Sequence, residues 1–341
     1  MQKQNAKNIL AEILKFPKAK IIITTHQKPD ADAMGSSLGL FLFLKQLGFS
    51  VTVISPTDFA KNLKWMPGVE NVIEFEQDVE ACVALTNESD FIFCLDFNAL
   101  SRINEFGEIV KNSGAKKVLI DHHQNPESFA EFNFWDVKAS STCELVYQFI
   151  KESNNENLVD KDMASCLYAG IMTDTGSFKY GNCTAETHLI VAGLLSKGAN
   201  NVEITEQIYD TFSKERVQFI GFAISQKMVV MEEYNTALIT ITREEIAQYK
   251  LQTGDTEGLV NYGLSIDGVK FAALIIDRTK MVKMSFRSKG NFSVNNFARL
   301  HFNGGGHFNA SGGSSTETLE NTVLKFNEVL KNHKKELNES T

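Results

Sequence analysis

Apolar and polar residues alternate along the first part of the chain in blocks typical of strands and helices. Short aliphatic runs, each ending at a polar residue, predict buried strands at 19–25, 50–55, 90–96 and 116–121. Longer stretches with helical periodicity predict helices at about 33–47, 99–112, 140–152, 160–172 and 185–197. This alternation indicates a mostly parallel sheet with helices on both faces, and therefore an α/β fold.

The pattern changes in the second part of the chain. Residues 226–242, 271–279 and 281–288 are typical of successive strands of a second sheet. A glycine-rich stretch follows at 303–313, and a closing helix is predicted at about 316–336. We therefore expect a larger domain at 1–196, a linker with one short helix at 197–216, and a smaller α/β domain at 217–341.

Composition excludes a membrane-spanning or disulfide-rich class. The chain has 341 residues, 43% of them hydrophobic, which is enough for two globular cores. No apolar run approaches the length of about 18–20 residues that a bilayer requires. The five cysteines are odd in number and form no CxxC, as expected for reduced thiols. These features predict a cytoplasmic protein that does not bind a membrane.

Charge is distributed unevenly within a formal net charge of −8. Residues 1–214 hold 19 basic and 28 acidic residues, a balance of −9, and residues 215–341 hold 15 and 14, a balance of +1. Within the second part, 270–299 carries seven basic residues against one acid. An acidic half could hold cations and a basic half could hold phosphate, although a solvated charged surface explains these counts equally well.

Acids and imidazoles follow the predicted strands. His26, Asp30 and Asp32 come after the first strand, Asp96 ends another, and Asp121, His122 and His123 end a further one, while Asp174 follows a predicted helix. A single aspartate in such a place is usually an N-cap or a turn former. The carboxyl ends of parallel strands converge on one rim, where so many carboxylates would repel one another unless cations neutralised them. The sequence therefore predicts a metal site.

The residue types narrow the choice of metal. Oxygen and imidazole ligands without thiolate suit Mn²⁺ or Mg²⁺ and disfavour a structural zinc site. There are more candidate ligands than one ion can take. Two ions bridged by carboxylates form a common arrangement for hydrolysing phosphoesters.

Five ordered motifs carry a resemblance to a known family. They are HQKPDADAMGS at 26–36, LD at 95–96, DHH at 121–123, TDTGSF at 173–178 and GGGHFNASGG at 304–313. The first four resemble the motifs of the DHH phosphoesterase superfamily, and the fifth resembles the glycine-rich signature of its DHH-associated C-terminal domain. Ser311 departs from the family's usual Ala-Ala-Gly at this point, which is a small change.

The resemblance implies roles for individual residues. It implies that His26, Asp30 and Asp96 hold one ion, and that Asp32, Asp96, His122 and Asp174 hold the other. Neighbouring side chains on an extended backbone point in opposite directions. His122 could therefore bind metal while His123 faces the substrate phosphate, as the resemblance also implies, with Asp121 orienting an imidazole.

The resemblance also implies an active site in the cleft between the two domains. Phosphate contacts are expected from the second domain, where consecutive glycines could expose backbone N–H groups, and from two weaker candidates after the second and third motifs. The expected substrate-binding residues are Arg287, Gly304, Gly305, Gly306, His307, Arg102 and Ser141. Without its neighbours, the glycine-rich stretch would be interpreted as a flexible loop.

Size and domain pairing resemble most the bifunctional oligoribonucleases that also act as 3′-phosphoadenosine 5′-phosphate phosphatases. This implies a hydrolase with a two-metal mechanism and two divalent ions, Mn²⁺ before Mg²⁺ or Co²⁺. Its expected substrates are short oligonucleotides or a nucleoside bisphosphate, and a homodimer is possible. Three alternatives stay open: a phosphodiesterase for linear dinucleotides in cyclic-dinucleotide turnover, a family II inorganic pyrophosphatase, and a non-enzymatic nucleotide-binding module.

Overall fold

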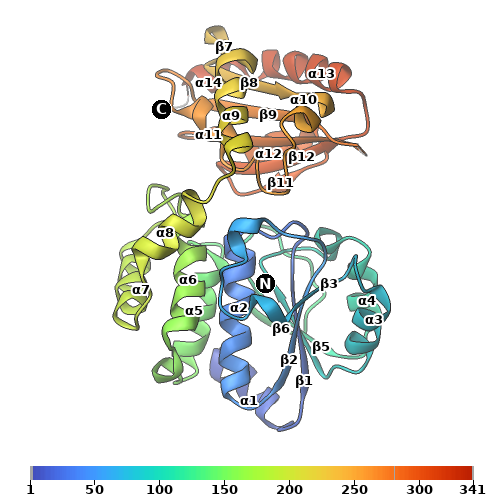
Figure 1. Cartoon of the computed structure of the whole chain (residues 1–341), viewed down its shortest axis with the longest axis vertical. Helices are drawn as coiled ribbons and strands as arrows, with labels where there is room; N and C mark the ends of the chain where they lie inside the picture. The colour runs from blue at the N-terminus through green and yellow to red at the C-terminus, as the bar shows by residue number, and fades with distance from the viewer. Residues whose placement is uncertain (1–2, 280, 340–341) are drawn as a thin grey trace. The chain divides into compact units, whose positions relative to one another are not determined.

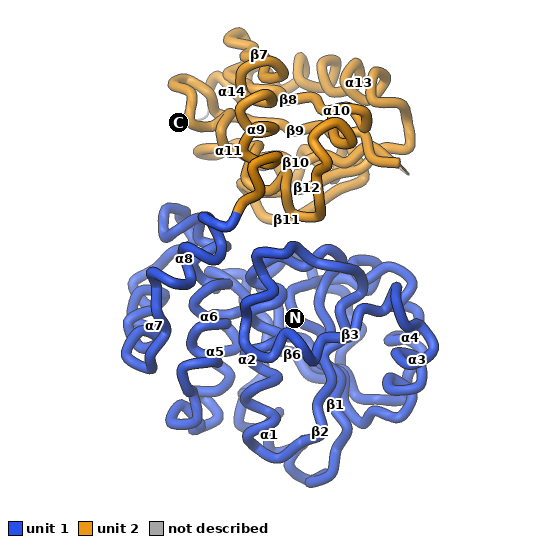
Figure 2. Tube along the Cα trace, in the orientation of Figure 1, with its two compact units in different colours: residues 1–211 blue, residues 212–341 orange. Residues whose placement is uncertain are grey.

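The computed structural model describes residues 3–279 and 281–339 and divides the chain into two compact units, 1–211 and 212–341 (Figures 1 and 2). Each unit is built around its own six-stranded sheet. None of the helices in the described ranges is both long enough and apolar enough to cross a bilayer.

The sheet of the first unit is parallel throughout, in the order β3-β2-β1-β4-β5-β6. Its strands are β1 (Lys20–Thr25), β2 (Ser50–Ser55), β3 (Val72–Glu74), β4 (Phe91–Leu95), β5 (Lys116–Asp121) and β6 (Phe132–Trp135). Its helices are α1 (Ala6–Leu14), α2 (Ala31–Gln46), α3 (Val79–Asn87), α4 (Phe106–Asn112), α5 (Thr142–Glu152), α6 (Lys161–Asp174), α7 (Ala185–Ser196) and α8 (Asn201–Tyr209). The predicted α/β class and its parallel sheet are confirmed.

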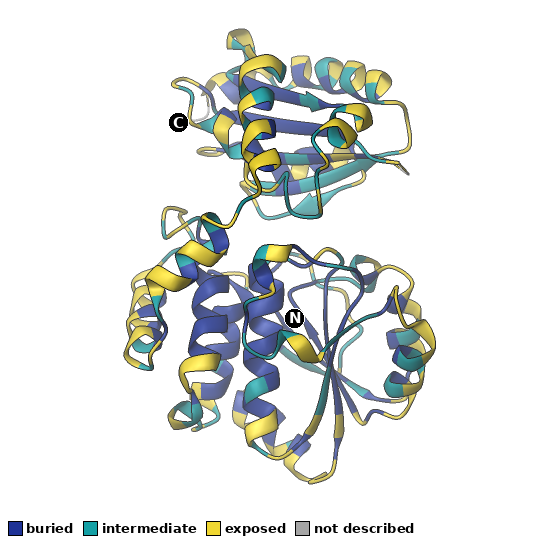
Figure 3. Cartoon of the chain, viewed as in Figure 1, coloured by how far each residue is buried: buried dark blue, intermediate teal, exposed yellow. Residues whose placement is uncertain are grey.

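Strand residues alternate between two apolar layers, because successive side chains of a strand point to opposite faces. In β4, Phe91, Phe93 and Leu95 pack in one core with helices α1, α2, α5, α6, α7 and α8. Ile92 and Cys94 of the same strand pack in the other core with α3 and α4. Helices α2, α5 and α6 pack against one another and are mostly buried, as Figure 3 shows.

Three details of the first unit differ from the predicted elements, and one is that helix α3 was not predicted. The helix expected at 99–112 is broken, since Asn104 has a φ of 51° between the 3-10 turn Leu100–Ile103 and α4. A residue with positive φ cannot continue a right-handed helix, whose residues have φ near −60°. The short edge strands β3 and β6 were not predicted, because neither presents a continuous aliphatic run.

The segment 197–216 divides between the two units. Helix α8 packs Ile204 and Ile208 into the core of the first unit. Helix α9 (Lys214–Phe222) belongs to the second unit and continues into a π-helical turn, Ala223–Lys227.

The second unit contains a mixed sheet in the order β11-β12-β10-β9-β8-β7. Its strands are β7 (Met228–Met231), β8 (Thr236–Ile241), β9 (Phe271–Asp277), β10 (Val282–Ser288), β11 (Gly305–Gly306) and β12 (Ala310–Ser315). Besides α9, its helices are α10 (Arg243–Gln248), α11 (Leu259–Leu264), α12 (Val294–His301), α13 (Leu319–Asn332) and α14 (Lys334–Glu339). Helices α12 to α14 pack on one face of the sheet, and α9 and α11 pack on the other.

Candidate metal centre

Three neighbouring strands deliver the predicted residues to one rim of the first sheet. Strands β1, β4 and β5 are adjacent and parallel, so their carboxyl ends lie side by side. His26 follows β1, Asp96 follows β4, and Asp121 is the last residue of β5. The start of α2 and the end of α6 add three more carboxylates. We call His26, Asp30, Asp32, Asp96, His122 and Asp174 the carboxylate–histidine cluster.

One part of the cluster surrounds the imidazole of His26. Its Nε2 lies 3.5 Å from Oδ2 of Asp96 and 4.0 Å from Oδ2 of Asp30. Its Nδ1 donates a hydrogen bond of 2.8 Å to the carbonyl oxygen of Gln27. Because a carbonyl can only accept, this bond leaves the Nε2 lone pair directed at the carboxylates.

The other part surrounds His122, which is buried. Its Nε2 lies 3.4 Å from Oδ2 of Asp174, 3.6 Å from Oδ1 of Asp96 and 3.8 Å from Oδ2 of Asp32. Its Nδ1 donates to the carbonyl of Ala139 at 3.2 Å. Both histidines therefore present Nε2 to carboxylates, and Asp96 lies between them, with Oδ2 towards His26 and Oδ1 towards His122.

The distances from these Nε2 atoms to the carboxylate oxygens suit binding of a common metal ion better than direct hydrogen bonds. Ligand atoms about 2.1 Å from one cation lie roughly 3–4 Å apart, whereas a charge-assisted N–H···O bond is about 2.7–2.9 Å long. The ligand atoms of His26, Asp30 and Asp96 lie within 4.8 Å of one another, as do those of Asp32, His122 and Asp174. The donor set contains only oxygen and imidazole nitrogen. The residues present therefore fit two divalent cations.

Without cations, the cluster binds protons strongly at its histidines. Burial alone would lower the pKa of His26, but the carboxylates of Asp96 and Asp30 outweigh it and raise the pKa to about 9. The pKa of His122 is also raised to about 9, since Asp174, Asp32 and Asp96 outweigh its burial.

The pKa values of the carboxylates shift in two directions. Burial, together with the neighbouring carboxylates, raises the pKa of Asp32 well above its usual range and that of Asp174 to about 6. Burial would raise the pKa of Asp96 too, but His26, His123 and His122 outweigh it and lower this pKa. Asp96 is thus the carboxylate held most firmly in its charged form.

The second histidine of the DHH motif has a different environment. His123 Nδ1 donates a 2.7 Å hydrogen bond to Oδ1 of the fully buried Asp121, and it lies 3.7 Å from Oδ1 of Asp96. The backbone carbonyl of His123 accepts a 2.7 Å bond from the Trp135 indole. Asp121 therefore orients His123, while His122 takes its orientation from Ala139.

A segment that the sequence did not single out holds two of the carboxylates. The backbone N–H groups of Thr142 and Cys143, at the start of α5, donate to the two oxygens of Asp32 at 2.7 and 2.9 Å. The hydroxyl of Thr142 donates to Oδ1 of Asp96 at 2.9 Å. The only sequence signal was the predicted helix start at 140, which marks a helix N-terminus suited to anions.

The two weaker phosphate candidates lie in different settings. Arg102, in the 3-10 turn after β4, is partly exposed, and its charge acts on His26 against protonation. Ser141 is fully buried, and its hydroxyl accepts the Glu144 N–H as the N-cap of α5. The Ser141 hydroxyl is thus engaged in the cap.

In the second unit, Arg287 and the glycine-rich stretch lie on neighbouring strands. Arg287 of β10 pairs with Ala310 of β12, and β12 pairs with Gly305 and Gly306 of β11. The N–H of His307 donates to Ala310 O at 2.7 Å. The stretch expected as a loop therefore contains a short strand.

The glycines permit a close approach to β12. A Cβ at Gly304 would lie 2.0 Å from the carbonyl oxygen of Gly312, and one at Gly306 would lie 2.7 Å from that of Ala310. Gly306 also has a φ of 146°. A side chain at either position would require the backbone to move.

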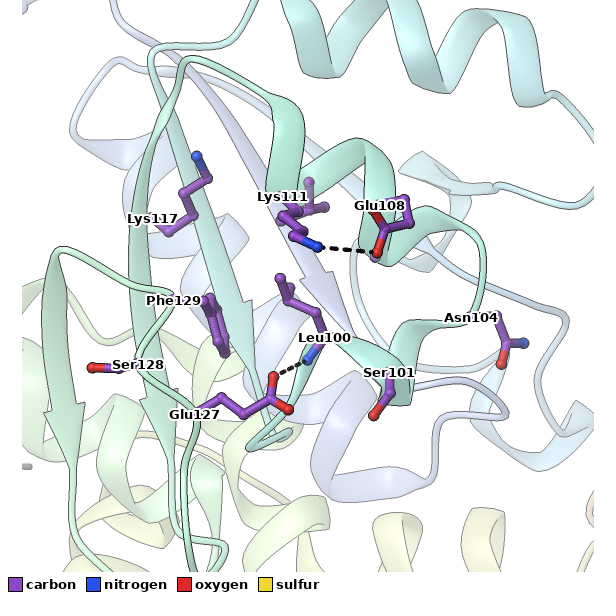
Figure 4. A pocket seen from close by; sticks show the side chains of 11 residues that line it. Leu100, Ser101, Asn104, Glu108, Lys111, Lys117, Glu127, Ser128 and Phe129 are labelled. Carbon is purple, nitrogen blue, oxygen red and sulfur yellow. Dashed lines mark hydrogen bonds and ion pairs between the residues drawn. The ribbon is translucent and has the colours of Figure 1, made fainter.

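A pocket of about 540 Å³ lies beside α4 (Figure 4). Within it, Lys111 pairs with Glu108, and Glu127 accepts the Leu100 N–H. Its lining includes none of the six cluster residues. This pocket is therefore separate from the carboxylate–histidine cluster.

Comparison with known proteins agrees with this geometry. Residues 20–171 match the model of the DHH family, N-terminal domain, and residues 235–338 match that of the DHHA1 domain. The chain is 30% identical over 304 residues to the bifunctional oligoribonuclease and PAP phosphatase NrnA of Thermus thermophilus, covering 89% of this chain and 86% of that protein.

Two solved structures are also similar. An exopolyphosphatase-related protein from Bacteroides fragilis is 41% identical, with a TM-score of 0.91 and 98% coverage of both chains. RecJ from Thermus thermophilus, solved in complex with Mn²⁺, is 12% identical with a TM-score of 0.55, covering 97% of this chain and 54% of RecJ. The first unit therefore has the fold of the DHH phosphoesterases. The chain belongs to the DHH family and is a hydrolase of phosphoester bonds.

Proposed function

We propose that this protein hydrolyses short oligoribonucleotides and 3′-phosphoadenosine 5′-phosphate with two divalent metal ions, Mn²⁺ in preference. The observation that carries the proposal is the position of Asp96, whose two oxygens lie 3.5 and 3.6 Å from Nε2 of His26 and His122. Such a carboxylate is suited to bridge two ions. The names of the curated relatives support the substrates.

In this proposal, His26, Asp30 and Asp96 hold one ion, and Asp32, Asp96, His122 and Asp174 hold the other. When bound, two such ions activate a water molecule and stabilise the negative charge that develops on phosphorus oxygens. The preference for Mn²⁺ follows from the mixture of imidazole and carboxylate ligands without thiolate. RecJ, which shares the fold, binds Mn²⁺ in its structure.

The remaining residues bind and orient the substrate. His123, oriented by Asp121, faces a phosphate oxygen and donates to it through Nε2 when its ring is doubly protonated, and Arg102 adds a positive charge near His26. Arg287, His307 and the glycines at 304–306 bind the far end of the substrate.

A substrate panel tests the proposal. Metal-stripped protein is assayed with Mn²⁺, Mg²⁺ or Co²⁺ on a dinucleotide, a pentanucleotide, a long single strand, 3′-phosphoadenosine 5′-phosphate and pyrophosphate. The short RNAs and the bisphosphate should be cleaved fastest, best with Mn²⁺, and not at all after chelation. A preference for pyrophosphate, or for the long strand, would overturn the proposed substrates.

A further inference from the structure

The chain makes an unusual turn directly after Asp174. Gly176, Ser177 and Phe178 have φ values of 58°, 59° and 64°, so three successive residues are left-handed and two of them carry side chains. Ser and Phe adopt this conformation at an energetic cost. The turn persists only because the surrounding structure holds it.

Several contacts fix the turn. The N–H of Ser177 donates to Met172 O at 2.7 Å, and the N–H of Phe178 donates to the hydroxyl of Thr175 at 3.0 Å. The Phe178 ring packs edge-on against Tyr168, with centroids 6.2 Å apart. The turn therefore reverses the chain next to the cluster.

The reversal places Tyr180 over Gly176. The N–H of Tyr180 donates to Thr175 O at 3.0 Å, one residue after Asp174. A Cβ at Gly176 would lie 2.5 to 2.9 Å from three atoms of the Tyr180 ring, so only glycine allows the ring to lie there. One side of the ring thus rests on the backbone, and the residue remains 43% exposed.

The fold uses the backbones of Lys179 and Tyr180 but not the polar ends of their side chains. Across residues 3–279 and 281–339, the Tyr180 hydroxyl and the Lys179 ammonium form no hydrogen bond or ion pair, and Tyr180 belongs to neither apolar core of the first unit. Lys179 is exposed. A half-exposed aromatic side chain and an exposed lysine are therefore consecutive in sequence and follow Asp174 closely.

We propose that Tyr180 is a stacking platform for the base of a nucleotide whose phosphate lies at the carboxylate–histidine cluster, with Lys179 pairing with an adjacent phosphate. This inference rests on the proposed function and specifies which part of the substrate the first unit binds. Every base has a π-face, so stacking of this kind accepts any sequence. It would let one site act on short RNAs regardless of their bases.

The test pairs removal of the ring with removal of the base. Tyr180→Leu, Tyr180→Phe and wild-type protein are assayed with Mn²⁺ on a dinucleotide and on its two singly abasic forms. Stacking on one base contributes about 1–3 kcal/mol, so Tyr180→Leu should lower kcat/KM on the intact dinucleotide by about 5- to 150-fold. On the abasic form that lacks the stacked base, Tyr180→Leu should lower kcat/KM by less than about threefold. Tyr180→Phe should retain most of the wild-type rate on all three substrates.

An equal loss on all three substrates, or no loss on the intact dinucleotide, would overturn the platform. Failure of the proposed function is separate, since it would appear as a wild-type protein that does not cleave the dinucleotide. In that case the inference is tested by AMP binding, measured by calorimetry with Mn²⁺. Tyr180→Leu should bind AMP more weakly than the wild-type protein, and equal affinity of the two proteins would overturn the inference. Bound Mn²⁺ should be the same in all three proteins.

Discussion

The hydroxyl of Thr142 donates a 2.9 Å hydrogen bond to Oδ1 of Asp96, across 46 residues of sequence. The same residue's backbone N–H donates to Asp32 at 2.7 Å. One residue at the start of α5 thus orients two carboxylates of the cluster. Because these bonds fix where the carboxylate oxygens lie, Thr142 should control metal affinity without being a ligand.

Thr142→Val removes the hydroxyl but keeps the backbone N–H and the side-chain shape. Loss of a bond that orients a metal ligand typically lowers metal affinity about 10- to 100-fold, and we expect this loss in a Mn²⁺ titration. Thr142→Ser keeps the donor and is the matched control. If the Val and Ser variants bound Mn²⁺ equally well, the hydroxyl would have no part in ordering the cluster.

Substitutions of the two histidines of the DHH motif should have different effects on metal binding and on the rate of hydrolysis. His122 faces three carboxylates through Nε2, whereas His123 is bound to Asp121. We expect His122→Ala to lose bound metal and activity, and His123→Ala to keep its metal while losing rate. Metal content of the two purified variants decides this, and equal metal loss in both would refute the division of roles.

Metal-free protein should lose stability as the pH rises from about 6.5 to 9. His26 and His122 have pKa values raised to about 9 in the folded state, against an ordinary value of 6.5. The folded state then binds more protons than the unfolded state, so its stabilisation is complete below pH 6.5 and disappears through pH 9. Melting temperatures of metal-free protein at pH 6.5 and 8.5 measure the effect.

Substituting both histidines with Asn should flatten this dependence. The increase in melting temperature caused by Mn²⁺ should also be larger at pH 8.5 than at pH 6.5, because protons compete with the ion for these histidines less strongly at the higher pH. A stability of the metal-free protein that increased between these pH values would contradict the electrostatic description of the cluster.

Arg287 tests the role proposed for the second unit. Arg287→Ala deletes a charge-assisted contact to phosphate of about 1.5–3 kcal/mol, or about one to two decades in binding. Dinucleotides and 3′-phosphoadenosine 5′-phosphate should be cleaved correspondingly more slowly, while a small activated phosphodiester should be cleaved at a nearly normal rate. Arg243→Ala, which removes an exposed arginine paired with Asp277 in the same unit, is the control. An equal decrease on the small ester would assign Arg287 to the chemistry or to folding.

The cluster could be predicted because each of its strand-end residues directly follows a recognisable pattern in the sequence. His26, Asp96 and Asp121 each lie at the end of a strand with a recognisable aliphatic pattern. Parallel pairing of these strands then brings the three residues to one edge of the sheet. Thr142 could not be found this way, since its contact with Asp32 spans 110 residues and depends on how α5 meets α2. The break at Asn104 was equally hidden, because a single left-handed residue leaves the apolar periodicity around it intact.

The secondary structure of the glycine-rich stretch was harder to predict. Gly305 and Gly306 form a short strand against β12, where glycines in sequence suggest a loop. That pairing is long-range, and glycine-rich segments carry little side-chain pattern from which to predict it.

Asp96 provides the most direct test of the central claim, since both histidines of the cluster face its carboxylate. Dinucleotide hydrolysis is measured with saturating Mn²⁺ for wild-type protein, Asp96→Ala, and Asp162→Ala as a control that removes an exposed carboxylate from α6. We predict that Asp96→Ala retains less than about a tenth of the wild-type rate, a barrier increase above roughly 1.4 kcal/mol, while Asp162→Ala is unaffected. An Asp96→Ala protein that keeps more than a tenth of the rate would contradict a two-ion centre bridged by this residue.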